Sequence, residues 1–236
     1  MISLFNKRPE IHLDCFCTEE TLFELFPIKY AKDAIPSWFK KIPSSKKLDK
    51  TVPFLNIKSS FKHCTGITDL YKQGFIIPLW TDFLIDTTNE GEVFFDIKVG
   101  SKKSLVHWDS NNVLGTKSEY FTMHKLNSPW YIKTKQSCNM FFTNTFWNTR
   151  FPQLQAVNGV IDFKYTHSTN VNFILRKEPF RVLFEAGIPF IHIVPLTDAK
   201  IVLHQHLEPD KTRFTTIPFF RNPVAKLKKL RERYRL

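Results

Sequence analysis

From Phe75 onward the chain is a series of short apolar runs separated by polar turns, and this pattern constrains the fold more than any other feature. The runs are FIIPLW, TDFLID, EVFFDIKV, YFTMHKL, WYIKT, CNMFFTN, GVIDF, VNFILR, FRVLF, IPFIHIVPL, KIVLHQHL and TTIPFF. Each has the length of a strand, and no long helical pattern lies between them. The pattern therefore predicts a mainly β domain over residues 75–221, built as an antiparallel sandwich or barrel, in which the turn TTNEGE closes a β-hairpin.

Residues 1–74 are predicted to form a mixed segment of short helices and loops that packs on the main domain. The stretch TEETLFELF, residues 18–26, predicts a two-turn helix with Thr18 as its N-cap. The stretch TGITDLYKQG, residues 65–74, predicts a second helix that begins at Thr65 as N-cap and ends at Gly74. Between them, the polar run SSKKLDK predicts a loop.

The third predicted part is a basic C-terminal helix over residues 222–236. Pro223 fits its first turn, and apolar residues recur at helical spacing beneath a basic face. The net charge of the chain is +12, and residues 221–236 carry half of that excess. The basic residues expected to bind a partner there are Lys226, Lys228, Lys229, Arg231, Arg233 and Arg235. Such a tail can bind nucleic acid, an acidic protein or an anionic membrane surface, or it can be no more than a solvated helix face.

Cysteine and glycine usage exclude several kinds of site. The four cysteines form no C-x-x-C pair, so we expect reduced thiols in a cytosolic protein and no cysteine metal centre. Cys15 and Cys17 would share one side of an extended segment. Only seven glycines are present, which excludes a glycine-rich phosphate loop. No apolar run is long enough for a signal peptide or a transmembrane helix.

The stretch GVID, residues 159–162, followed by Tyr165, resembles the third motif of the trimeric dUTPase and dCTP deaminase superfamily. The resemblance covers roughly residues 125–200 and implies a related β-fold. It also implies that Asp162 and Tyr165 are candidate catalytic residues of a diverged, Mg²⁺-dependent nucleotide hydrolase or nucleotide-binding protein. A carboxylate beside an aromatic ring can hold a sugar hydroxyl and act as a general base.

The chain departs from the motifs of that superfamily at three places. Where the superfamily has an Arg-Ser-Ser segment for phosphate, this chain has FTNTFWNTR, in which Arg150 or Thr143 is the substitute. Lys164 replaces a second acidic residue, and the glycine-rich closing segment is missing. The alternative reading of Asp162 is a strand-end aspartate that caps its own turn, and the departures favour it.

A second candidate site is the H-x-D pattern of His107 and Asp109 on a predicted strand. With His204 or His206 as a third ligand, it would match the facial triad of Fe(II) oxygenases, and Arg213 would hold the carboxylate of 2-oxoglutarate. The alternative is a chance pattern in a chain with eight histidines, since Asp109 also begins a turn-forming run.

Further stretches are similar to an uncharacterised protein family of tailed phages that infect marine bacteria. They are NKRPEIHLDCF, IPSWFKKIPSS, HCTGITDLYKQGFIIPLWTDFLI, LNSPWYIKT and GIPFIHIVPL. This resemblance implies a viral protein in the cytoplasm of the bacterial host or in the virion. We therefore expect a β-rich binding or assembly protein that lacks an intact catalytic set and needs no cofactor. Its expected partner is another protein or a second copy of itself, with nucleic acid as the alternative through the tail.

Overall fold

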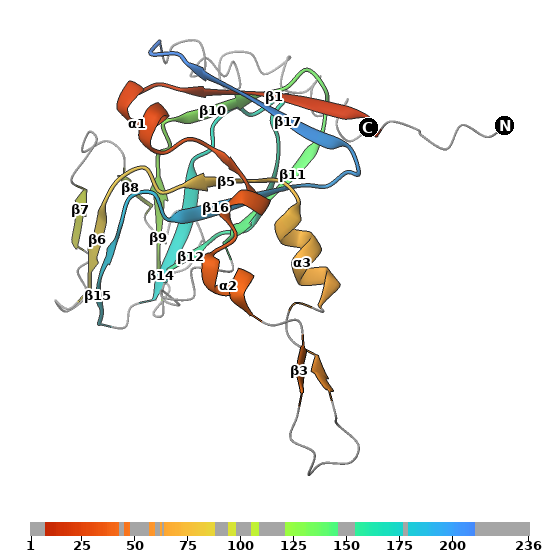
Figure 1. Ribbon diagram of the computed structural model, residues 1–236. Coiled ribbons are helices and arrows are strands. Elements are labelled where there is room, and N and C mark those ends of the chain that lie inside the picture. The colour runs from red at the N-terminus through yellow and green to blue at the C-terminus, as the bar shows by residue number, and fades with distance from the viewer. Residues whose placement is uncertain are drawn as a thin grey trace, which may run out of the picture.

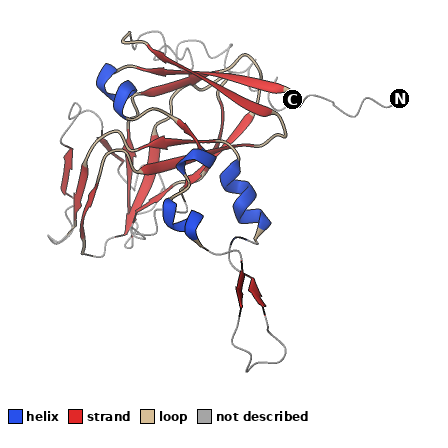
Figure 2. Ribbon diagram, viewed as in Figure 1, coloured by secondary structure: helices blue, strands red, loops and turns tan. Residues whose placement is uncertain are grey.

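The structure is a computed structural model, and it describes residues 8–42, 45–47, 57–59, 62, 64–87, 94–97, 105–108, 121–145, 154–176 and 179–210. Strands dominate the described residues, and the helices are short and lie in the N-terminal third (Figures 1 and 2). None of the helices in the described ranges is long and apolar enough to span a bilayer.

The helical elements of the described residues all precede the fifth strand. They are α1 (Glu20–Leu25), the 3-10 helix η1 (Ala31–Ala34), α2 (Ser37–Lys41) and α3 (Thr65–Lys72).

The strands follow one another closely along the chain. They are β1 (Glu10–Cys17), β2 (Lys29–Tyr30), β3 (Ser45–Lys47), β4 (Ile57–Ser59), β5 (Phe75–Pro78), β6 (Phe83–Asp86), β7 (Phe94–Ile97), β8 (Leu105–Trp108), β9 (Phe121–Leu126), β10 (Trp130–Lys133), β11 (Asn139–Asn144), β12 (Leu154–Ala156), β13 (Gly159–Asp162), β14 (Val171–Arg176), β15 (Arg181–Phe184), β16 (Pro189–Pro195) and β17 (Lys200–Leu207).

These strands form several sheets. The largest has the order β13-β11-β16-β5-β2, and a second has the order β12-β14-β9-β8. Two three-stranded sheets have the orders β15-β6-β7 and β10-β1-β17, and β3 and β4 form a hairpin that stands away from the rest (Figure 1). The prediction of a mainly β fold with antiparallel sheets is confirmed. No sheet within the described ranges closes on itself as a barrel.

One strand pair departs from the antiparallel pattern. β1 pairs in parallel with β17 over all eight residues, from Glu10 opposite Lys200 to Cys17 opposite Leu207. A parallel pair needs a long connection, and here nearly the whole chain lies between its two strands. β1 and β2 thus place parts of the first 74 residues inside the same sheets as the later strands.

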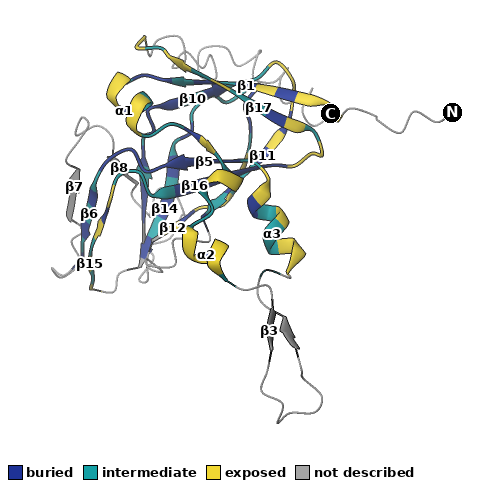
Figure 3. Cartoon of the chain, viewed as in Figure 1, coloured by how far each residue is buried: buried dark blue, intermediate teal, exposed yellow. Residues whose placement is uncertain are grey.

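A phenylalanine-rich core lies between the sheets. Its largest fully buried side chains include Trp130, Phe75, Phe83, Phe163, Phe173 and Phe184. Figure 3 shows the buried positions along the central strands and the exposed positions concentrated on the helices and the strand ends. A small second cluster, built around Phe39 of α2 and Tyr71 of α3, packs these two helices together.

The structure confirms some of the four local predictions and corrects others. The β6–β7 hairpin is confirmed, because Phe83–Asp86 pairs antiparallel with Phe94–Ile97. Both helices exist, but neither threonine caps its helix. Thr18 instead donates a hydrogen bond to the carbonyl of Pro129, 3.4 Å away, and Thr65 is the first residue of α3. The predicted loop SSKKLDK contains the strand β3, which pairs with β4.

Candidate functional site: a basic groove beside a histidine pair

The mixed sheet of β10, β1 and β17 has one buried face and one exposed face. Along β1 the apolar residues Ile11, Leu13, Cys15 and Cys17 are buried, and the residues between them point outward. This alternation of inward and outward residues is the period of two that a half-buried strand requires. The sequence IHLDCFC therefore fixes which side chains β1 shows to solvent.

The outward face carries mainly polar and ring side chains from both parallel strands, with Val202 as an aliphatic exception. On β1 these are Glu10, His12, Asp14 and Phe16, and on β17 they are Lys200, Val202, His204 and His206. The register sets Glu10 beside Lys200, Asp14 beside His204, and Phe16 beside His206. Side chains that are far apart in the sequence thus form one continuous polar surface.

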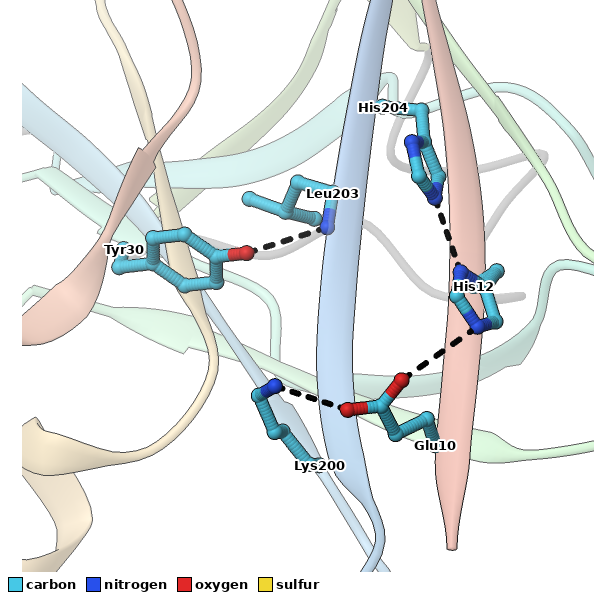
Figure 4. Close-up of polar contacts among 6 residues, drawn as sticks. All are labelled: Glu10, His12, Tyr30, Lys200, Leu203 and His204. Carbon is cyan, nitrogen blue, oxygen red and sulfur yellow. Dashed lines mark hydrogen bonds and ion pairs between the residues drawn. The ribbon is translucent and has the colours of Figure 1, made fainter.

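A chain of polar contacts runs across this face from Lys200 to His204 (Figure 4). Lys200 Nζ lies 2.8 Å from Glu10 Oε1, and this hydrogen bond and the carboxylate charge raise the pKa of Lys200. The other oxygen of Glu10, Oε2, lies 3.7 Å from His12 Nε2. His12 Nδ1 in turn lies 2.9 Å from His204 Nε2, and the planes of the two rings differ by only 14°. We call His12 and His204 the histidine pair.

Asp14 and His206 form a separate contact farther along the same face. His206 Nε2 lies 3.2 Å from Asp14 Oδ1, and its ring stacks on Phe16 with the ring centroids 5.0 Å apart. Lys133 of β10 places its ammonium group 5.9 Å from the centre of the Phe16 ring. His206 therefore contacts Asp14 and Phe16 rather than the histidine pair.

The outer edge of β17 is held by the segment around β2. The hydroxyl oxygen of Tyr30 accepts a hydrogen bond of 3.1 Å from the backbone nitrogen of Leu203. The side-chain amide of Gln205 bonds both the N–H and the C=O of Ile28, each at 3.0 Å. These contacts join the mixed sheet to the five-stranded sheet, and they position Tyr30 beside Lys200.

An open groove of about 820 Å³ lies between these two sheets. Its walls come from the start of β1, from β2 and η1, from the end of α3, and from the turn between β16 and β17. The lining residues are Arg8, Glu10, Tyr30, Lys32, Lys72, Gln73, Gly74, Pro195, Thr197, Asp198, Ala199, Lys200 and Ile201. We call this feature the basic groove, because it has four basic side chains and two acidic ones.

The four basic residues of the groove differ in how far their charges are already neutralised. Lys200 is paired with Glu10, and Lys72 lies 3.2 Å from Asp69 on the same helix. Lys32 lies 5.7 Å from the centre of the Tyr30 ring. Within the described part of the chain, neither Arg8 nor Lys32 makes an ion pair. These two cations are therefore the ones most available to an incoming anion.

Gly74 and His192 shape the inner wall of the groove. Gly74 has φ of 72°, a conformation that favours glycine, and it turns the chain from α3 into β5. His192 of β16 lies fully buried behind it, donates from Nε2 to the carbonyl of Gln73 at 2.8 Å, and stacks on Tyr71. Its Nδ1 has no hydrogen-bond partner among the residues that the structure describes. Burial lowers the pKa of His192, so the neutral ring is the favoured form.

Asp162 ends β13 as a structural residue. The residue is 4% exposed, and its carboxylate accepts a hydrogen bond of 2.9 Å from the backbone nitrogen of Lys164 and a second one from Ser137 Oγ. The interpretation that Asp162 caps its own turn is confirmed by these bonds. The ring of Tyr165 faces the ammonium group of Lys164 at 5.3 Å. Asp162 and Tyr165 are not among the residues that line the basic groove.

The remaining predicted site residues are divided between described and undescribed segments. The backbone of His107 is part of β8, but its side chain lies outside the described residues. Also outside them are Asp109, Arg150, Arg213 and the whole range 211–236. That range contains Lys226, Lys228, Lys229, Arg231, Arg233 and Arg235. Thr143 is on β11. No group of three or more His, Cys, Asp or Glu side chains in the described ranges is arranged to hold a metal ion.

The partners that the structure gives to His204 and His206 are His12 and Asp14, which sequence reasoning missed. A second H-x-D pattern, His12-Leu13-Asp14, stands in a stretch whose alternation IHLDCFC marks it as a half-buried strand. That alternation was the sequence signal that could have placed His12 and Asp14 on the outward face of a strand. The parallel register that brings His12 into contact with His204 and Asp14 into contact with His206 is a tertiary feature, which local sequence patterns do not predict. No protein family, no characterised protein and no solved structure matches this chain.

Proposed function

We propose that the protein is a β-rich binding protein that holds an acidic segment of a protein partner in the basic groove. One observation carries the proposal: four basic side chains from distant parts of the chain converge on a single open groove. A groove with an excess of one sign of charge concentrates ligands of the opposite sign and steers their approach. Arg8 and Lys32 supply the charges that no described carboxylate neutralises.

The size and the openness of the groove favour a segment of a partner. Its 820 Å³ matches the volume of sites that bury a small ligand, yet most of the residues that line it are polar and exposed. The carboxylates of an extended acidic peptide can contact Arg8 and Lys32 while its backbone stays near solvent. Interactions of this exposed kind weaken as salt is added.

The test measures binding of a fluorescent hexaglutamate peptide at low and at physiological ionic strength. The double variant R8Q/K32Q should weaken binding about tenfold at low salt, which corresponds to about 1.4 kcal/mol. The control double variant K135Q/R181Q also removes one lysine and one arginine charge, but from exposed positions outside the groove lining. It should bind the peptide as tightly as the unchanged protein does. Equal losses in both double variants would mean that only net charge matters, and the groove proposal would fail.

The viral context and the finer architecture belong to the same proposal. The resemblance to marine phage proteins supports an assembly role in the host cytoplasm or the virion, with self-association or a basic helix over residues 222–236 as the second contact. The resemblance over residues 125–200 supports a dUTPase-like or jelly-roll-like sandwich. Deleting residues 222–236 should leave the melting temperature unchanged and weaken partner association; unchanged association would remove the tail from the proposal.

Two enzyme alternatives are tested by ligand-induced stabilisation. A nucleotide hydrolase using Asp162 and Tyr165 predicts a higher melting temperature with deoxynucleoside triphosphates and Mg²⁺. An oxygenase using His107, Asp109 and His204 or His206 predicts a higher melting temperature with Fe(II) and 2-oxoglutarate. The hydrogen bonds that Asp162 accepts from Lys164 and from Ser137 weigh against the first. The partners of His204 and His206 on β1 weigh against the second.

A further inference from the structure

The histidine pair on the exposed face of β1 and β17 brings two nitrogens that can bind metal close together. A metal ion bonds an imidazole nitrogen at about 2.0–2.1 Å, so two nitrogens bound at right angles lie about 2.9 Å apart. The observed separation of His12 Nδ1 and His204 Nε2 is 2.9 Å. Right-angled ligand positions are typical of the square-planar and tetragonal sites of Cu²⁺ and Ni²⁺.

The present contact between the two rings is a hydrogen bond, in which one nitrogen donates to the other (Figure 4). To bind an ion, each ring has to turn so that its lone pair points at the metal. The side chain of His12 is 55% exposed, and His204 is exposed as well. Exposed side chains change rotamer within nanoseconds, so this turn disturbs no packed core.

The carboxylate of Glu10 lies near the other ring nitrogen of His12. A metal-bound histidine commonly donates its other ring N–H to a carboxylate, which fixes the tautomer and the ring orientation. In this structure the other nitrogen of His12, Nε2, lies 3.7 Å from Glu10 Oε2, and Lys200 holds the second oxygen of Glu10 at 2.8 Å. When His12 Nδ1 binds metal, the proton of the ring resides on Nε2 and faces this carboxylate.

We propose that His12 and His204 form a two-histidine binding site for a divalent transition-metal ion of the Cu²⁺ or Ni²⁺ kind, with Glu10 as the positioning residue of His12. Water completes the coordination on the solvent side of the sheet. The affinity should follow the general order Mn²⁺ < Co²⁺ < Ni²⁺ < Cu²⁺, with Zn²⁺ below Cu²⁺. The ion would tie β1 to β17 at the face next to the basic groove and would raise the melting temperature.

The experiment is a calorimetric titration of the full-length protein, without a histidine tag, with NiCl₂. We expect one bound ion, and we expect H12Q and H204Q each to abolish its binding. H206Q is the matched control, because His206 lies on the same exposed face but contacts Asp14 and Phe16 instead; it should bind nickel with unchanged affinity. E10Q should weaken binding about 10- to 100-fold.

Electron paramagnetic resonance of the Cu²⁺ complex gives an independent readout. The unchanged protein should show hyperfine coupling to two imidazole nitrogens, and H12Q should lose one of them. Absence of nickel binding would overturn the proposal. If nickel still binds to both H12Q and H204Q, the ion lies elsewhere and the proposal is overturned. The same holds if H206Q abolishes nickel binding as completely as H12Q and H204Q do.

Discussion

The hydroxyl oxygen of Tyr30 lies 3.1 Å from the backbone nitrogen of Leu203, although the two residues are 173 positions apart. This bond satisfies an N–H group on the outer edge of β17 and links two sheets that share no strand pairing. An unpaired edge N–H would be left to solvent or to another chain. The contact therefore stabilises the edge that also forms a wall of the basic groove.

Replacing Tyr30 by phenylalanine should lower the free energy of unfolding by about 1 kcal/mol, because one hydrogen bond is lost and the ring is kept. Gln205→Ala should cost more, since the Gln205 amide bonds both the N–H and the C=O of Ile28. Urea unfolding of the two variants checks both values. If Y30F is as stable as the unchanged protein, the bond to Leu203 does not hold the sheets together.

Gly74→Ala should destabilise the protein by more than about 1 kcal/mol. The φ of Gly74 is 72°, and an added Cβ would collide with the carbonyl oxygen of Ile193 in the neighbouring strand β16. Gly66→Ala is the control, because an added Cβ there meets no atom within 4 Å and alanine favours the helix α3. Thermal unfolding should show a lower melting temperature for G74A and an equal or higher one for G66A.

Local patterns predicted the strands but not the way they meet. The alternation in WYIKT or CNMFFTN is a property of a few neighbouring residues, and these stretches became β10 and β11. The histidine pair joins residues 192 positions apart through a parallel register, which depends on the packing of the whole chain. The turn-capping role of Asp162 could be predicted from the sequence, because an aspartate side chain at a turn commonly hydrogen-bonds the backbone nitrogen two residues after it.

The cap of α1 was mispredicted for a related reason. A threonine before a helix is a good N-cap only if its hydroxyl stays free for the helix. The hydroxyl of Thr18 bonds the carbonyl of Pro129, which precedes β10, and no sequence pattern shows that neighbour. The basic groove could not be predicted either, because its lining residues come from segments far apart in the chain.

Only one of the four cysteines should react with a thiol reagent in the native protein. Cys64 is exposed, whereas Cys15, Cys17 and Cys138 are buried, and none of the four forms a disulfide. Burial also raises the pKa of Cys15 and of Cys138, with Asp14 and Asp162 adding to the effect, so the reactive thiolate is disfavoured at both. Titration with Ellman's reagent should release one equivalent from the folded protein and four after denaturation. C64S should release none when folded; a fast-reacting thiol in that variant would contradict the burial of the other three.

The stability of the fold should fall as the pH drops below about 6.5, the ordinary pKa of histidine, partly because of His192. The ring of His192 is fully buried, its Nε2 donates to the carbonyl of Gln73, and the described part of the chain offers its Nδ1 no acceptor for a second proton. Burial lowers its pKa in the folded state, so the unfolded chain binds the proton more readily between the two pKa values. Stability from this residue is complete above pH 6.5 and is lost as the pH falls toward the folded pKa.

His192→Gln tests this assignment, because glutamine can donate to the Gln73 carbonyl but takes up no proton. The variant should show a smaller decrease in the free energy of unfolding between pH 7.5 and pH 5.5 than the unchanged protein does, whatever its own stability at pH 7.5. H206Q serves as the comparison, since it removes an exposed histidine and should leave more of the decrease in place. If H192Q and the unchanged protein lose equal stability over this range, the pH dependence arises from other groups, and the neutral form of His192 is not what stabilises the wall between β16 and α3.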